Sequence, residues 1–246
     1  MARGIRLDQA LVQRGYFTSR HQAQAAIMAG EVTIDGRMAG KASHPVRLEA
    51  QISVAVRNRY VGRGGLKLES VLAHFQIDCC DKVALDIGAS TGGFTDCLLQ
   101  NGARTVFAVD VGHGQLAWKI RQDPRVVVLE RINARRLSPK EIPEPIDLCT
   151  IDVSFISLTL ILPNAFELLT PNGVILALIK PQFELAKADV NRGGIVRDPA
   201  LHDKAQKKVR DFAQAMGAQI DGLAPSAITG ADGNQEFFIC LRKPSA

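Results

Sequence analysis

The sequence predicts an α/β protein with two parts, a large domain built on a seven-stranded sheet and a small α+β domain in front of it. From residue 67 onwards, apolar strand-like runs alternate with stretches of helical periodicity, which is typical of a parallel sheet with helical crossovers. Residues 1–58 instead combine two short amphipathic stretches with alternating, strand-like segments. The length of 246 residues is sufficient for both parts.

The small domain, residues 1–58, should contain two helices followed by a hairpin. Residues 7–13 place apolar side chains on one helical face, and a glycine follows shortly afterwards. Ser19 and Gln22 have the spacing of a capping box, which predicts that a second helix starts there. Strands are expected at 32–34 and 52–56, with an Asp-Gly turn after the first of them.

The positive charge of the chain is concentrated near its N-terminus. Of the 30 basic and 25 acidic residues, nine and four lie in residues 1–60, which leaves 21 of each in the remainder. The whole net charge of +5 therefore belongs to the first quarter of the sequence. A basic module in front of a neutral body suggests that the module binds a polyanion.

This module resembles the small RNA-binding domain that is named after a small-subunit ribosomal protein and is shared with tyrosyl-tRNA synthetases and pseudouridine synthases. The matching residues are Arg6-Leu7-Asp8, Leu11, Thr18-Ser19-Arg20, Ala23, Ile27, Gly30 and Val32-Thr33-Ile34-Asp35-Gly36. The resemblance implies that RNA is the partner. Because guanidinium groups pair well with phosphates, Arg6, Arg20 and Arg37 are the expected contacts. A solvated basic face without a partner is the alternative.

Residues 59–66 are predicted to be a linker, because glycines and basic residues alternate there. Arg59 and Arg63 could contact RNA, and the ring of Tyr60 could stack on a base. A plain linker with no role in binding is the alternative. A helix should follow from about residue 66 to residue 75.

The large domain, residues 67–246, should alternate strands and helices. Strands are expected at 83–87, 105–109, 126–129, 148–151, 174–179, 219–223 and 236–241, and helices around 93–101, 114–121, 155–168 and 199–216. The last strand follows its predecessor without a helix, so it should run antiparallel to its neighbours.

The stretch from residue 82 to residue 95 reads as a buried strand, a glycine-rich turn and the start of a helix that includes Phe94. Gly88, Gly92 and Gly93 would allow a ligand to approach the main chain closely. Ser90, Phe94 and Asp152 are expected to bind the same ligand. A dinucleotide-binding turn has a second glycine where this sequence has Ser90. Asp86, two residues before the first glycine, suits a ligand with an ammonium group and a sulfonium, such as S-adenosyl-L-methionine (SAM).

A second acid supports this choice of cofactor. Asp110 ends the next strand, 24 residues after Asp86, which is close to the offset of about 20 residues at which a carboxylate meets ribose hydroxyls. We therefore expect Asp110, with the adjacent Val111, to contact the ribose of SAM. An ordinary strand-to-helix loop with no ligand is the alternative.

Four charged residues should meet at the cofactor crevice. Asp152 and Lys180 each follow a strand of the parallel sheet, and Glu236 begins the antiparallel strand, so all three lie at the same edge. Lys67, ahead of the first strand, could close the group. A lysine can accept the proton of a weakly acidic hydroxyl, which makes Lys180 the predicted base, and the two acids would orient the two lysines. Taken singly, each residue could simply be a solvated charge at a strand end.

Lys67, Asp152, Lys180 and Glu236 match in order and context the lysine-aspartate-lysine-glutamate tetrad of ribose 2′-O-methyltransferases similar to the FtsJ heat-shock enzyme. With the basic module in front, the chain resembles the TlyA, or haemolysin-like, family. Further matches are Tyr60 to Leu68, Asp86 to Thr95, Ile151 to Ser157, Ile179 to Glu184 and Gly193 to Asp198.

The family resemblance implies the seven-stranded, Rossmann-like fold of SAM-dependent methyltransferases. It also implies methylation of a cytidine ribose in ribosomal RNA, within ribosomal subunits, and places Asn133 and Ala134 near the adenine of the cofactor. A non-catalytic protein that binds RNA or the ribosome, and a haemolysin that acts indirectly on membranes, are the alternatives. The modified nucleotide and the oligomeric state stay open.

Composition limits the other possibilities. No apolar run approaches the ~18 residues of a membrane span, and the N-terminus lacks the apolar core of a signal peptide, so we expect a cytoplasmic protein. The five cysteines show no paired spacing, so the sequence indicates neither a disulfide framework nor a metal site.

Overall fold

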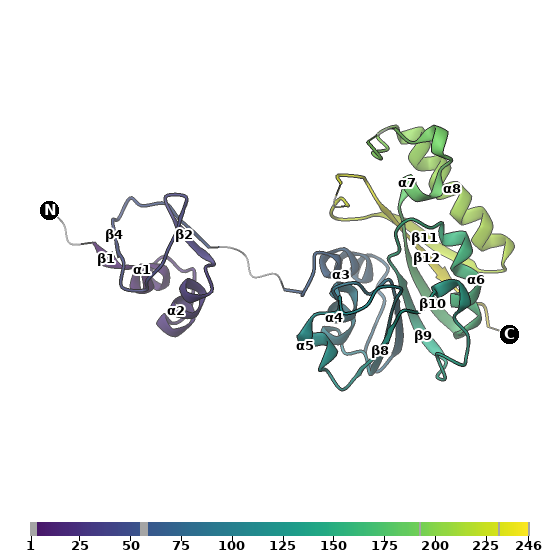
Figure 1. Ribbon diagram of the computed structural model, residues 1–246, viewed down its shortest axis with the longest axis horizontal. Helices are drawn as coiled ribbons and strands as arrows, with labels where there is room; N and C mark the ends of the chain where they lie inside the picture. Colours follow the sequence, from purple (N-terminus) through teal and green to yellow (C-terminus); the bar gives the residue numbers. More distant parts are fainter. Residues whose placement is uncertain (1–3, 55–58, 192, 231, 246) are drawn as a thin grey trace. The chain divides into compact units, whose positions relative to one another are not determined.

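The computed structural model describes residues 4–54, 59–191, 193–230 and 232–245 (Figure 1). The chain divides into two compact units, Met1–Asn58 and Arg59–Ala246. Each unit has its own apolar core. None of the helices in the described ranges is long and apolar enough to cross a membrane.

The first unit contains two helices and short antiparallel strands around a small core. Its elements are β1 (Ile5–Arg6), α1 (Leu7–Gln13), α2 (Arg20–Met28), β2 (Val32–Ile34), β3 (Arg37–Met38), β4 (Pro45–Val46) and β5 (Ile52–Val54). As the capping-box spacing predicts, the Ser19 hydroxyl accepts a hydrogen bond from the amide of Gln22 at the start of α2. β2 pairs with β3 and β5, and the last two residues of the strand expected at 52–56 lie outside the described ranges.

The second unit is built on the predicted sheet of seven strands, in the order β11-β12-β10-β9-β6-β7-β8. The strands are β6 (Val83–Ile87), β7 (Thr105–Asp110), β8 (Val126–Glu130), β9 (Ile146–Ile151), β10 (Leu169–Ile179), β11 (Gln219–Pro225) and β12 (Phe237–Arg242). β12 is antiparallel to both of its neighbours, and the other described pairings are parallel. The predicted orientation of the last strand is therefore confirmed.

Helices cover both faces of this sheet (Figure 1). On one face lie α3 (Gly64–His74), α4 (Gly93–Gln100) and α5 (Trp118–Arg121), and on the other α6 (Leu162–Glu167) and α8 (Pro199–Ala215). The short α7 (Pro181–Glu184) follows β10, and three 3₁₀ turns are η1 (Ala134–Arg136), η2 (Leu158–Leu160) and η3 (Lys187–Asp189). Alternate residues of each strand face the two helical layers, so the central strands are apolar on both sides.

Two predicted helices are shorter than expected, for local reasons. The helix expected at 114–121 is reduced to α5, because Gly114 has a positive φ of 70° and Ala117 is extended. The helix expected at 155–168 is replaced by η2 and α6, whose first turn contains Pro163. Proline is tolerated at the start of a helix but not in its interior, which explains why α6 begins only at Leu162.

The segment 59–66 differs from the predicted linker. Tyr60 is only 2% exposed and packs in the core beneath α3 and α4, and α3 already begins at Gly64. A Cβ atom on Gly65 would lie 2.2 Å from Cγ of the Tyr60 ring, so this glycine serves close packing rather than flexibility. The segment therefore belongs to the second unit.

Candidate active site

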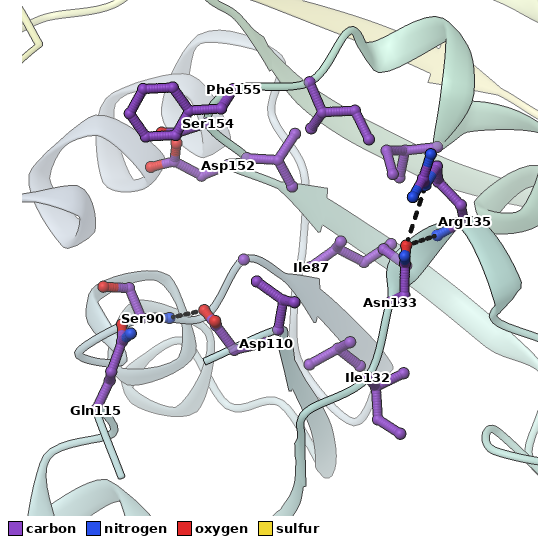
Figure 2. A pocket seen from close by; sticks show the side chains of 17 residues that line it. Ile87, Ser90, Asp110, Gln115, Ile132, Asn133, Arg135, Asp152, Ser154 and Phe155 are labelled. Atoms are coloured by element: carbon purple, nitrogen blue, oxygen red, sulfur yellow. Dashed lines mark hydrogen bonds between the residues drawn. The ribbon is translucent and has the colours of Figure 1, made fainter. Parts of the chain in front are cut away.

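A cavity of about 480 Å³ opens at the carboxyl ends of β6, β7 and β9 (Figure 2). Of the residues predicted to bind the cofactor, it is lined by Gly88, Ser90, Asp110, Val111, Asn133, Ala134 and Asp152. A smaller hollow of about 130 Å³ shares Gly88, Ser90 and Asp152 with it and adds Gly93 and Phe94. Because they share three lining residues, we call the two hollows together the crevice. It lies at the carboxyl ends of the parallel strands, where ligands bind in open α/β sheets.

Asp110 holds the glycine-rich turn against the end of β7. Its Oδ2 accepts a hydrogen bond from the amide of Ser90 at 2.8 Å, and its Oδ1 accepts one from the amide of Gly112 at 2.7 Å. A carboxylate has about four acceptor positions, so roughly two remain for the hydroxyls of a ribose. Figure 2 shows this carboxylate beside the cavity, opposite Asp152, Ser154 and Phe155.

Gly88 brings two strand ends unusually close together. Its φ is 87°, its amide donates to Val109 O at 2.8 Å, and a Cβ atom here would lie 2.2 Å from Asp152 O. Only a glycine allows the ends of β6 and β9 to meet in this way. The close approach places Asp152 on the wall of both hollows.

Gly92 lies next to the crevice in the sequence but lines neither hollow, so its role in cofactor binding stays a prediction. It lies neither on the cavity nor on the smaller hollow, and its missing side chain would point at Leu116 and Ile120 in the core. With a φ of 94°, Gly92 instead turns the chain into α4.

Asp86, the other acid expected to bind the cofactor, is completely buried. Along β6 it shares the face of Ala84, beneath α4, and it lines neither hollow. Its carboxylate accepts hydrogen bonds from the hydroxyls of Thr95 at 2.6 Å and Thr150 at 3.0 Å. Burial raises the pKa of Asp86 to about 6. The residue therefore fastens α4 to the sheet and does not line the crevice.

The four residues of the predicted catalytic group form two ion pairs. Lys180 Nζ lies 2.6 Å from Asp152 Oδ1, and Lys67 Nζ lies 2.5 Å from Glu236 Oε2. The side chains of Lys67 and Glu236 are 10% and 3% exposed. Because Ile179 pairs with Phe237 across β10 and β12, Lys180 and Glu236 occupy adjacent strand ends. Two lysines and two acids thus lie at the edge where the crevice opens.

The predicted RNA contacts of the first unit are arranged around a buried acid. Arg6 and Arg20 are exposed, and both guanidinium groups donate to Asp8, at 3.0 Å and 2.9 Å. The hydrogen bonds from Arg6 are the main cause that holds the pKa of Asp8 well below its usual range. Arg37 is exposed on β3.

Of the three predicted RNA contacts in the second unit, two are exposed and one is buried. Arg59 and Arg63 are exposed, the first paired with Glu69 and the second donating to Thr229 O at 3.1 Å. Tyr60 is buried, so its predicted stacking on an RNA base is wrong for this conformation. The Arg59 guanidinium covers the Tyr60 ring from 5.3 Å.

Several lining residues were not predicted individually, among them Gln115, Ser154 and Phe155. Ser154 accepts a hydrogen bond from Lys180 at 3.0 Å. Phe155 is 91% exposed with a φ of 63°, and its ring centroid lies 5.0 Å from that of Phe183. The segment after Ile151 matched a family motif, but spacing alone gave no role to its serine or its phenylalanine.

The side chains that line the crevice are suited to bind SAM. Asp110 retains acceptor positions for the ribose, and Asn133 and Ala134 line the cavity, Asn133 on the side away from Asp152 (Figure 2). A sheet of this strand order, with a glycine turn after β6 and an acid at the end of β7, defines a SAM-dependent methyltransferase.

Comparison with known proteins assigns the family within this class. The chain belongs to the FtsJ-like methyltransferase family, whose model matches residues 60–243. A model of the S4 domain matches residues 5–52. Both matches confirm the resemblances that the sequence motifs indicated.

Similar proteins match almost the whole chain. A proposed rRNA methyltransferase of Bacillus subtilis, YqxC, is 48% identical over 97% of this chain and 86% of its own length. The 16S/23S rRNA (cytidine-2′-O)-methyltransferase TlyA of Mycobacterium tuberculosis is 45% identical over 98% of this chain and 91% of its own. A solved structure of a proposed hemolysin from Streptococcus thermophilus has a TM-score of 0.76 and 42% identity, and covers 100% of this chain and 90% of that one.

Proposed function

We propose that this protein methylates the 2′-hydroxyl of a ribose, that of a cytidine in ribosomal RNA, and that its substrate is a ribosomal subunit. The observation that carries the proposal is the Lys180–Asp152 ion pair at the crevice, where Asp152 lines both hollows. The S4 domain supports RNA as the partner, and the Mycobacterium tuberculosis relative is named for this reaction.

The chemistry requires little of the protein beyond positioning and proton removal. SAM, when bound, supplies a methyl group on a good leaving group. After its ammonium has released a proton to water, Lys180 Nζ accepts the proton of the ribose hydroxyl, and Asp152 stabilises the ammonium that forms again, from 2.6 Å. Lys67 and Glu236 compensate each other's charge in their buried pair and form the neighbouring wall of the site.

The proposal is tested by incubating the purified protein with labelled SAM and separate ribosomal subunits, followed by nucleoside mapping. We expect label on a cytidine 2′-oxygen. Lys180→Ala should reduce the rate by about 10²-fold or more, while binding of SAM and RNA stays near normal. Lys180→Arg should not restore the rate, because arginine stays protonated.

Lys82→Ala is the matched control. Lys82 immediately precedes β6, at the opposite edge of the sheet, so its removal should leave the rate unchanged. Label on a base would contradict ribose methylation. An active Lys180→Arg protein would show that Lys180 acts by charge alone.

A further inference from the structure

Ser154 contacts the proposed base directly. It follows the end of β9 by three residues, it is exposed, and its hydroxyl lines the larger cavity. Its Oγ accepts a hydrogen bond from Lys180 Nζ at 3.0 Å. Figure 2 shows Ser154 beside Asp152 on one side of the cavity.

The two partners of the Lys180 amine differ in kind. Asp152 Oδ1 lies 2.6 Å from Lys180 Nζ, but this contact does not meet the angular limits of a hydrogen bond. Oδ1 accepts no hydrogen bond from any described residue. It therefore acts as an ion-pair partner, which fixes a distance and favours no particular rotation of the amine. The bond to Ser154 satisfies the angular limits of a hydrogen bond, and hydrogen bonds are directional.

A base that removes a proton needs a lone pair aimed at that proton. The neutral amine of a lysine has two N–H bonds and one lone pair in a tetrahedral arrangement, and it rotates freely about its last carbon–nitrogen bond unless a partner restricts it. We propose that Ser154 is a positioning residue: by accepting one N–H, it restricts this rotation and limits the lone pair of Lys180 to the two remaining directions, both turned away from Ser154. This inference rests on the proposed function.

The loop that carries Ser154 is anchored at both ends. At its start, the Asp152 amide donates to Ile87 O at 2.9 Å. At its end, the buried carboxylate of Glu184 accepts hydrogen bonds from the Leu158 amide at 2.7 Å and the Ser157 hydroxyl at 2.5 Å. Such anchoring holds the Ser154 hydroxyl at a fixed place relative to β9, which a positioning role requires.

The proton balance leaves the serine unchanged. The O–H bond of the ribose breaks as an N–H bond forms on Lys180 Nζ, the methyl group of SAM passes to the ribose oxygen, and the ammonium later returns its proton to water. Ser154 accepts a hydrogen bond throughout and transfers no proton. Its removal should therefore slow the chemical step without altering what the protein binds.

The test compares Ser154→Ala with Ser154→Thr under single-turnover conditions, with saturating SAM and ribosomal subunits. We expect the alanine variant to lose about tenfold or more in rate, because a positioned proton acceptor contributes ~10²–10⁴-fold and only its orientation is impaired. Threonine keeps the hydroxyl and should restore most of the rate. SAM affinity, measured by calorimetry, and RNA affinity, measured by filter binding, should change by less than about twofold in either variant.

Ser138→Ala, which removes a hydroxyl from a turn after η1 that lines neither hollow, is the control and should react at the wild-type rate. Wild-type rate in Ser154→Ala would overturn the inference. So would a threonine variant as slow as the alanine variant, or a loss that appears in RNA or SAM affinity instead. A wild-type protein that does not methylate ribose in the same assay would overturn the proposed function, and the inference with it.

Discussion

Asp86 is a carboxylate in the middle of a hydrophobic layer, and its surroundings determine what it does. It is 0% exposed, and two threonine hydroxyls donate to it from α4 and β9. Two hydrogen bonds do not fully replace water around a charge, so burial is the largest cause that raises its pKa from 3.8 to about 6. The cost of keeping Asp86 charged should be visible in the stability of the protein.

The stability of the second unit should therefore depend on pH through Asp86. Because the pKa is higher in the folded state, the folded state binds the proton more tightly between pH 4 and 6, and its stability falls as pH rises through this interval. The free energy of unfolding of the wild type, relative to Asp86→Asn, should decrease by about 2 kcal/mol from pH 4 to pH 6, as part of a total of about 3 kcal/mol between pH values well below 4 and well above 6.

Urea unfolding at a series of pH values measures this difference. Asp203→Asn, which removes an exposed carboxylate from α8, is the control and should show no comparable change. A wild-type to Asp86→Asn difference that is independent of pH would mean that Asp86 is charged at the same pH in the folded and unfolded states.

At the scale of the elements, strands and helices that follow from a local sequence pattern were predicted correctly. Features that depend on packing between distant segments were not. The strand expected at 83–87 is β6 to the residue, because its apolar run is buried on both faces. The burial of Tyr60 was not predicted. A tyrosine among glycines and arginines is typical of a linker, and only the packing of α3 and α4 shows that its ring lies in the core.

The candidate site divides in the same way. Lys180 and Glu236 could be predicted as neighbours because sheet topology alone brings strand ends to one edge. The position of Asp86 was not predicted: the alternation of side chains along β6 places it beneath α4, on the face of Ala84, and not on the wall of the crevice. The contact between Ser154 and Lys180 depends on the loop conformation around Phe155, with its positive φ, and no spacing rule gives that.

The junction of β6 and β9 can be tested at Gly88. An alanine there would suffer both the strain of a positive φ and a Cβ atom 2.2 Å from Asp152 O. Gly217→Ala is the matched control, because Gly217 has a similar φ of 83° with nothing within 4 Å of the added atom. Strain alone costs about 1–2 kcal/mol, which we expect for Gly217→Ala.

Gly88→Ala should cost clearly more than its control, because the ends of β6 and β9 must separate, and it should also abolish SAM binding. Urea unfolding and calorimetry measure the two effects. Equal losses of stability in the two variants, with SAM binding intact, would show that the strand ends separate at little cost.

At the scale of the whole molecule, RNA affinity and chemistry are assigned to different units. Each unit has its own core, and the exposed arginines organised by Asp8 lie in the first, whereas the crevice and both ion pairs lie in the second. Residues 1–58 hold eight basic and four acidic residues, which is +4 of the net charge of +5, so most of the electrostatic attraction to RNA should belong to the first unit.

Removal of residues 1–58 should therefore separate the two activities. The remaining unit keeps its core and its crevice, so calorimetry should show SAM binding close to that of the intact protein. RNA affinity should fall strongly. For the intact protein the logarithm of RNA affinity should decrease steeply with the logarithm of salt concentration, because phosphate contacts release counterions, and the truncated protein should show a shallower slope. Equal RNA affinity and equal slopes for the two proteins would assign the RNA anchor to the methyltransferase unit itself.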